Sequence, residues 1–450
     1  MVELVAQPPS NQLVAILPAL LVPNSAQPAF QVTFLTVLLC NFTTTYNHPL
    51  LPYARLVLAF PALYGCWSYG FSGAFGPLPN RKVDLGMAFL ATYGVLKILE
   101  ICVVGFWNSA ENWPKWVKLQ TVEERKENRP REMVPFTPTV MGRLAYAFDV
   151  ATTGGSSWYT GRAWDWATPA ILRQEARPLS RWHFIRNSLI YVAQSILIVD
   201  ICESVLSTRE WNSRKPRPLT DDGISMPLQF IYATCVCART MVGVSFTYTA
   251  IGILCALVIN TPSTAYPPMF DHPFASCSLA EFWSTTWHPI FRRTLDRISS
   301  GILSVTLFLF THSSKQTTIR TRRWVKVLRS IIIFGLSCFV HLIFLHALPT
   351  NEHFLYPSFF NMEVIKFFLA QPLGLTIEFL LVRPMTEGLP DARWGLKTAT
   401  RRAFTWAWLL WSGRYFADVW FNRGLLGLAE RDIVFSPVRG VLRDQWMISN

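Results

Sequence analysis

Residues 324–348 read WVKVLRSIIIFGLSCFVHLIFLHAL, an apolar run in which His341 is surrounded by large hydrophobic side chains. A helix needs about 20 mainly apolar residues to cross the hydrocarbon core of a bilayer. Backbone polar groups in that core must be paired within the chain, which an α-helix achieves by itself. This run therefore predicts a transmembrane helix with a histidine inside it.

Similar apolar stretches recur along the chain. They are residues 13–40, 52–70, 83–107, 184–206, 228–259, 301–312, 361–382 and 400–421. The 301–312 stretch is short for a span, so we expect it to be re-entrant or interfacial, and 228–259 is long for an upright span. The pattern predicts an all-α, polytopic integral membrane protein with about eight or nine transmembrane helices around an internal chamber.

The overall composition agrees with this class. Hydrophobic residues make up 51% of the chain and charged residues only 15%, whereas soluble domains carry about 25% charged residues. The net charge of +13 lies mostly in the connections between apolar stretches, where lipid head groups or the phosphates of a soluble cofactor would meet it, so we expect no nucleic-acid partner. The nine cysteines include no Cys-x-x-Cys spacing, so neither a bound metal nor a disulfide framework is predicted.

The apolar pattern divides the chain into three parts. Residues 1–107 hold the N-terminal transmembrane helices, 108–182 form a soluble or interfacial loop, and 183–450 form the main helical core. Within the loop, Gly154–Trp166 mixes glycine with aromatic residues, and because Trp and Tyr favour the membrane boundary, we expect it on the bilayer surface. The sequon at Asn41 lies so close to an apolar run that we do not predict its glycosylation.

Several apolar stretches contain ionisable side chains. Lys97 and Glu100 are three residues apart, and Arg414 and Asp418 are four apart. These spacings place each pair on one helix face, where its members can neutralise each other. We interpret both pairs as structural.

His341 is the intramembrane residue most suited to chemistry. Ionisable groups inside a membrane are functional hypotheses by default, and burial favours the neutral imidazole, which accepts a proton as a general base must. Ser337, one turn earlier on the same face, could orient the ring by a hydrogen bond. The alternative is a polar contact between helices without chemistry. His346 lies nearer the end of the helix, and we interpret it as interfacial.

A second candidate region is 278–293. Its apolar residues recur at intervals of three and four, as in an amphipathic helix that lies in the membrane interface. His288 lies on the other face, where Pro289 should bend or break the helix and leave the imidazole less packed. The alternative is an interfacial histidine among tryptophans that takes no part in chemistry.

Both regions resemble the wax synthase branch of the membrane-bound O-acyltransferase superfamily. The branch has the pattern Ser-Leu-x-x-Phe-Trp-x-x-x-Trp-His, and residues 278–288 match each of its fixed positions. The spacing from Ser337 to His341 is similar to the intramembrane Ser-x-x-x-His of the branch. Residues 161–166 are partly similar to an Arg-Gly-x-Gly-Trp-x-Trp element of fungal members that act in secondary metabolism. The sequence departs from the family at Leu342, where many relatives carry Glu, and at Pro289.

The resemblance implies roles for named residues. His341 would be the general base, and His288 would polarise the thioester carbonyl or position the acceptor. Residues 183–450 would then be the acyltransferase core. Residues that would orient or bind substrate are Ser337, Trp283 and Trp287. Arg292 and Arg293 are candidates for the phosphates of the acyl-CoA, or for lipid head groups.

The resemblance also implies the reaction. No permanently bound cofactor is expected; acetyl-CoA or another acyl-CoA is a co-substrate, and the other partners are an apolar alcohol and the bilayer. Similarity to the fungal members favours acetylation of a terpenoid or meroterpenoid hydroxyl at the endoplasmic reticulum. One alternative is a long-chain wax or sterol ester synthase. Another is a non-catalytic transporter, which would be expected to show duplicated halves that we do not find in the sequence.

Overall fold

The computed structural model describes most of the helical part of the chain. The residues described are 26–71, 81–106, 113–118, 132–152, 156–158, 160–167, 179–206, 218–221, 223–287, 291–310, 323–347, 359–389, 395–420 and 436–443.

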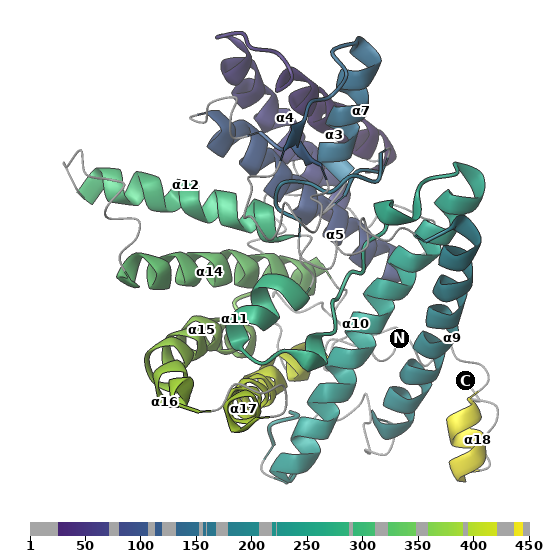
Figure 1. Ribbon diagram of the computed structural model, residues 1–450, viewed down its shortest axis with the longest axis vertical. Coiled ribbons are helices and arrows are strands. Elements are labelled where there is room, and N and C mark those ends of the chain that lie inside the picture. The colour runs from purple at the N-terminus through teal and green to yellow at the C-terminus, as the bar shows by residue number, and fades with distance from the viewer. Residues whose placement is uncertain are drawn as a thin grey trace, which may run out of the picture.

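Helices dominate the described residues (Figure 1). The longer ones are α3 (Ala26–Thr43), α4 (Leu51–Phe71), α5 (Arg81–Ile98), α7 (Val140–Thr152), α9 (Arg181–Leu206), α10 (Met226–Val258), α12 (Arg292–Phe310), α14 (Arg323–Ala347), α15 (Met362–Ile377) and α17 (Leu396–Trp420). Short elements are α11 (Leu279–Glu281), α16 (Arg383–Glu387), α18 (Pro437–Arg443), the 3-10 turns η2 (Val104–Phe106), η4 (Ser263–Ala265) and η5 (Pro273–Ala275), and the π-helical segments η1 (Leu99–Val103), η6 (Phe282–Thr286) and η8 (Glu378–Val382). Helices α9 and α10 lie side by side, as do α12 and α14.

Each apolar stretch recognised in the sequence contains a helix. The long stretch at 228–259 is one continuous helix, α10. The short stretch at 301–312 differs from expectation, because its helix α12 begins nine residues earlier, at Arg292. The first turns of α12 are polar, and they are stabilised by contacts to Glu100 rather than by apolar character.

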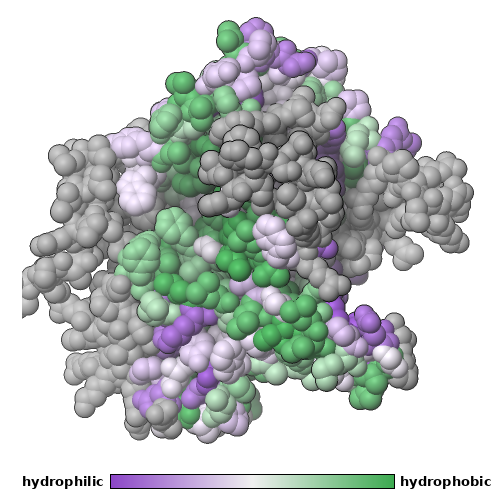
Figure 2. Space-filling view, turned by 90° about the vertical axis from the view of Figure 1, so that its left-hand side faces the viewer, coloured by the Kyte–Doolittle hydropathy of each residue, from purple (hydrophilic) through white to green (hydrophobic). Residues whose placement is uncertain are grey.

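The apolar surface of the long helices identifies an all-α, polytopic integral membrane protein. Five helical segments among the described residues are long and apolar enough to span a bilayer: 88–106, 181–206, 226–258, 324–345 and 362–387. Large hydrophobic side chains point outward from them, for example Leu254 and Leu369. Figure 2 shows hydrophobic residues gathered over the middle of one face. The total of eight or nine spans stays a prediction.

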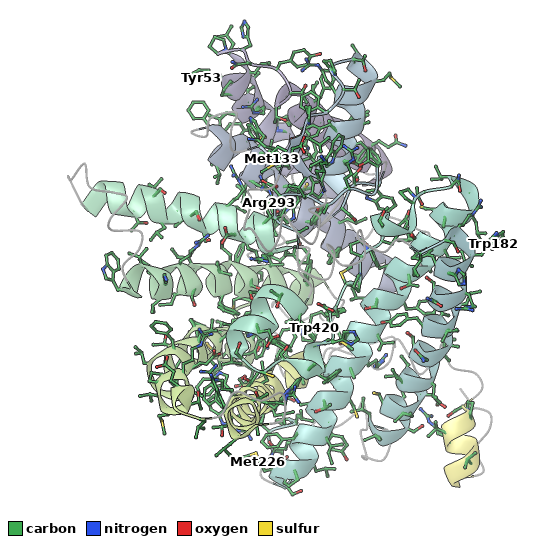
Figure 3. The ribbon with its side chains drawn as sticks, viewed as in Figure 1. Tyr53, Met133, Trp182, Met226, Arg293 and Trp420 are labelled. Atoms are coloured by element: carbon green, nitrogen blue, oxygen red, sulfur yellow. The ribbon has the colours of Figure 1, made fainter. Side chains whose placement is uncertain are left out.

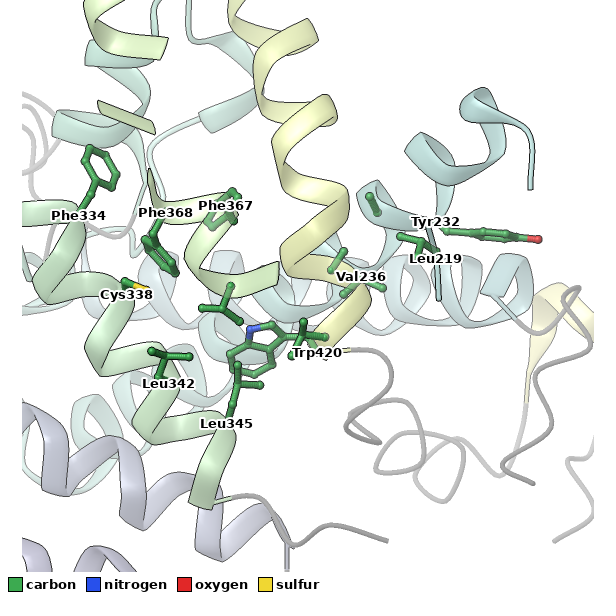
Figure 4. Packing of buried hydrophobic residues seen from close by; sticks show 14 of the residues in the cluster. Leu219, Tyr232, Val236, Phe334, Cys338, Leu342, Leu345, Phe367, Phe368 and Trp420 are labelled. Atoms are coloured by element: carbon green, nitrogen blue, oxygen red, sulfur yellow. The ribbon is translucent and has the colours of Figure 1, made fainter. Parts of the chain in front are cut away.

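The main hydrophobic core joins helices that are distant in sequence. Its buried members come mainly from α10, α14, α15 and α17, and they include Val236, Leu342, Phe367, Phe368 and Trp420. Figure 4 shows these side chains converging between the helices. Because this cluster surrounds the position of His341 on α14, the core and the candidate site share one region.

The segment between α5 and α9 is packed more tightly than the sequence indicated. Strands β1 (Trp116–Val117) and β2 (Met133–Val134) pair antiparallel, and Trp116 also bridges to Trp164. Trp164 is fully buried against Trp116, Tyr146 and Trp166. The bridges and these rings give the segment a small core of its own, which the sequence did not indicate, whereas its position at the bilayer surface stays a prediction.

The two predicted intramembrane ion pairs have different outcomes. Lys97 Nζ lies 3.4 Å from Glu100 Oε2, which confirms the first pair. The second was wrong: Arg414 donates to Gln229 Oε1 on α10, and Asp418 accepts from the backbone N–H of Leu219. Each of the two side chains thus has a partner outside α17 instead of pairing with the other.

Burial of Trp164 predicts a large loss of stability when the side chain is removed. Truncating a buried Trp to Ala typically costs about 3–5 kcal/mol. Trp164→Ala should therefore lower the thermal midpoint of the purified protein in detergent by several degrees. Trp182→Ala is the control, since that ring is 69% exposed and its loss should leave the midpoint nearly unchanged. Equal shifts for the two variants would contradict the packing described.

Candidate active site

The segment that carries the Ser-Leu-x-x-Phe-Trp pattern begins with a capped helical turn. Ser278 Oγ accepts a hydrogen bond of 3.0 Å from the backbone N–H of Glu281. Glu281 Oε2 in turn accepts one of 2.8 Å from the N–H of Cys277. This reciprocal arrangement is close to a capping box. Leu279 is fully buried, so the first two residues of the pattern fix where the turn starts and which side faces the protein.

A π-helical turn follows the cap. Phe282–Thr286 form η6, and the N–H of Trp287 donates to the carbonyl of Phe282 five residues earlier, at 2.9 Å. The backbone becomes extended at Trp287. The predicted break near His288 is confirmed, because the helical turns end at Thr286 and α12 begins at Arg292, so no single helix covers 278–293. Pro289, which cannot donate to the helical hydrogen-bond ladder, is the residue that indicated this break from the sequence. His288 lies outside the described residues.

Trp283 is held by a polar network inside the core. Its Nε1 donates to Gln371 Oε1 on α15 at 3.2 Å. The amide of Gln371, which is fully buried, donates to Ser412 Oγ on α17 and to the carbonyl of Phe367. With its indole N–H engaged in this way, Trp283 connects the segment to α15 and, through Gln371, to α17.

Trp287 packs among aromatic rings. Its ring stacks on Phe282 with centroids 5.2 Å apart, and it meets Phe270 edge-on at 4.8 Å. Aromatic pairs of this kind favour offset or edge-to-face geometry. Trp287 therefore packs the end of the π turn against Phe270, which precedes the turn in the sequence.

His341 is oriented by the backbone of its own helix. Its Nδ1 lies 2.7 Å from the carbonyl oxygen of Ser337, so the contact involves the Ser337 backbone and not the hydroxyl considered from the sequence. A carbonyl can only accept, so Nδ1 carries the hydrogen. In the neutral ring Nε2 is then the acceptor.

Aromatic rings surround His341. Phe368 of α15 and Phe416 of α17 lie 4.8 and 5.4 Å from its ring centroid, and Phe344 lies 5.9 Å away. The side chain is only partly buried. Within the part of the chain that the structure describes, Nε2 makes no hydrogen bond. The site thus presents one proton-accepting nitrogen in apolar surroundings.

The two candidate regions are linked through packed aromatic rings. Trp283 contacts Phe367, whose ring stacks on Phe416, and Phe416 contacts His341. Figure 4 shows Phe367 and Phe368 beside the helix that carries Leu342. The structure therefore places the Ser278–Trp287 segment and His341 around one cluster.

The two arginines after this segment occupy different surroundings. Arg292 is exposed. Arg293 is 9% exposed at its side chain; its Nε donates to Glu100 Oε1 at 3.0 Å, and its guanidinium lies over the ring of Trp166. Figure 3 shows Arg293 near the start of α12. Arg292 is thus the better placed of the two for a phosphate.

Neither Gln371 nor Glu378 was recognised from the sequence as part of this region. Both lie in the apolar stretch 361–382, and a polar or ionisable residue inside a membrane segment is the signal that could have indicated them. Among the described residues no group of three or more His, Cys, Asp or Glu side chains could hold a metal ion.

Fold and site together define a polytopic membrane protein with a partly buried histidine beside an aromatic core. The model of the Membrane bound O-acyl transferase family matches residues 266–362. That range includes the Ser278–Trp287 segment and His341, so this part of the chain is similar to membrane-bound O-acyltransferases. No curated protein matches the sequence.

The hydrogen bond between Trp283 and Gln371 predicts the effect of a conservative change. Trp283→Phe keeps an aromatic ring but leaves the buried Gln371 oxygen without its donor, which typically costs about 1–3 kcal/mol. The thermal midpoint in detergent should fall. Trp324→Phe, at a ring that is 48% exposed, serves as the control and should have little effect. If Trp283→Phe proves as stable as that control, the network does not hold the segment.

Proposed function

We propose that the protein transfers an acyl group from acyl-CoA to a hydroxyl of an apolar alcohol within the membrane. The observation that carries the proposal is the orientation of His341: Nδ1 is bound to the Ser337 carbonyl, and Nε2 remains as the acceptor in an apolar environment. The family match over this part of the chain supports acyl transfer as the chemistry.

The reaction needs one assisted proton transfer. His341 Nε2 accepts the hydroxyl proton while the alcohol oxygen attacks the thioester carbonyl carbon. The tetrahedral intermediate then expels the CoA thiolate as the C–S bond breaks, and the imidazolium returns its proton to that sulfur. A thioester is already activated, so holding both substrates in line and assisting this proton transfer can supply much of the acceleration.

We propose acetyl-CoA as the donor and a terpenoid or meroterpenoid alcohol as the acceptor. The resemblance to fungal acetyltransferases of secondary metabolism supports this choice, as do the phenylalanines around His341, which suit an apolar acceptor that arrives through lipid. Arg292 would meet the CoA phosphates, and His288 would assist at the thioester carbonyl. The endoplasmic reticulum membrane is the proposed location.

Replacement of His341 tests the proposal. Microsomes expressing the wild-type chain or His341→Ala are supplied with acetyl-CoA or palmitoyl-CoA and a panel of terpenoid, sterol and fatty alcohols, and CoA release is measured. General-base assistance contributes about 100- to 10,000-fold, so alcohol-dependent release should fall by that order in the variant. The thioester that is used distinguishes an acetyltransferase from a long-chain ester synthase.

The control is His183→Ala, which removes an exposed histidine at the start of α9. It should retain wild-type turnover at equal expression. Undiminished turnover in His341→Ala would remove this residue from catalysis. If no pair of substrates reacts in wild-type membranes, the acyltransferase proposal fails and the transporter alternative gains support.

A further inference from the structure

Two of the π-helical segments contain a buried glutamate. Glu100 lies in η1 and is 4% exposed; Glu378 begins η8 and is 2% exposed. Single π turns inside helices are rare and occur frequently at functional sites. A buried carboxylate is costly unless its oxygens are paired, so the partners of these two residues indicate what they do.

Glu378 binds the start of the Ser278–Trp287 segment. Its Oε2 accepts from the backbone N–H groups of Leu279 at 2.7 Å and Ala280 at 3.2 Å. Its Oε1 accepts from Nε and Nη2 of Arg383 at 2.9 and 2.8 Å. The π turn permits this, because its i→i+5 pattern brings Arg383 to the same side as Glu378.

Glu100 binds two residues that follow the Ser278–Trp287 segment in the sequence. Its Oε1 accepts from Arg293 Nε at 3.0 Å, and its Oε2 accepts from Thr294 Oγ1 at 2.7 Å. Lys97 and Arg297 also lie within ion-pair distance of this carboxylate, at 3.4 and 3.8 Å. Arg293 and Thr294 are the second and third residues of α12.

We infer that Glu378 and Glu100 are positioning residues that form a clamp: Glu378 holds the start of the Ser278–Trp287 segment, and Glu100 holds the start of α12. One carboxylate comes from the helix that also carries Phe367 and Phe368 beside His341, and the other from η1 at the end of α5. The clamp fixes the Ser278–Trp287 segment and the start of α12 relative to the helix that packs beside the His341 ring. This inference rests on the proposed function for its catalytic consequence, but the clamp itself is testable without activity.

The variant Glu378→Gln tests the hydrogen bonds of the clamp, because it removes the carboxylate charge while keeping the volume of the side chain nearly unchanged. The glutamine oxygen can still face the two backbone N–H groups, but its NH₂ group then points at the donors of Arg383. The double variant Glu378→Gln/Arg383→Gln restores a donor–acceptor match, because the second glutamine can accept from the first. Glu363→Gln is the matched control: this glutamate lies on the same helix and pairs with Lys366, not with the segment.

Cys277, next to Ser278, reports on the anchoring without any substrate. It is partly buried, and its sulfur lies 3.4 Å from Arg402 Nη2. In membranes we expect Glu378→Gln to raise the rate of maleimide labelling at Cys277 about tenfold, the double variant to return it near wild type, and Glu363→Gln to leave it unchanged. Labelling that persists in a Cys277→Ser background is subtracted. Unchanged labelling in Glu378→Gln at wild-type expression overturns the clamp.

The catalytic consequence is measured as ester formed per CoA released. A displaced segment should lower kcat and increase thioester hydrolysis by water in Glu378→Gln and Glu100→Gln, with recovery in the Glu378→Gln/Arg383→Gln variant. Failure of the double variant to recover either the labelling rate or this ratio counts against the clamp. Should wild-type membranes form no ester while the labelling pattern holds, the proposed function fails and the clamp stands.

Discussion

The absence of water from the hydrocarbon core governs how this protein arranges its polar side chains. Each polar group that enters the core needs a partner within the chain. His341 meets this need through the carbonyl one turn earlier, which leaves its other nitrogen as the acceptor. Gln371 meets it by accepting from Trp283 and donating to Ser412, so that one amide joins three separate parts of the chain. The same physical requirement that stabilises the fold therefore sets the orientation of the candidate base.

The Ser278–Trp287 segment shows how a short sequence pattern becomes a rigid element. Its serine caps a turn, its leucine is buried, and its first tryptophan bonds to a transmembrane helix. A helix of three residues followed by one π turn has little stability alone, since isolated helices of this length do not form in water. The segment depends on groups contributed by neighbouring helices, and its distance in sequence from Gln371 and Glu378 explains why one stretch of sequence does not contain the site.

The sequence predicted the parts of the structure that depend on local apolar character. The apolar stretches became helices, and Lys97 paired with Glu100 three residues away. Where partners come from distant residues the sequence was a poorer guide: Arg414 binds Gln229 and not Asp418, and the burial of Trp164 beside Trp116 was not indicated. The π turns were also missed, because the 3.6-residue period used to recognise helices cannot indicate an i→i+5 turn. The sequence showed that His341 is a histidine deep within an apolar stretch. Which ring nitrogen carries the hydrogen became evident only from the structure, which places the Ser337 carbonyl beside Nδ1.

The most direct test of the account is a cryo-electron microscopy map of the protein in lipid nanodiscs with a non-hydrolysable acyl-CoA analogue and an apolar alcohol. The account predicts the alcohol oxygen within hydrogen-bonding reach of His341 Nε2, about 3 Å away, and the carbonyl of the analogue beside that oxygen. An analogue bound where His341 cannot reach either reacting group, or a His341 ring that faces lipid away from the bound ligands, would contradict it.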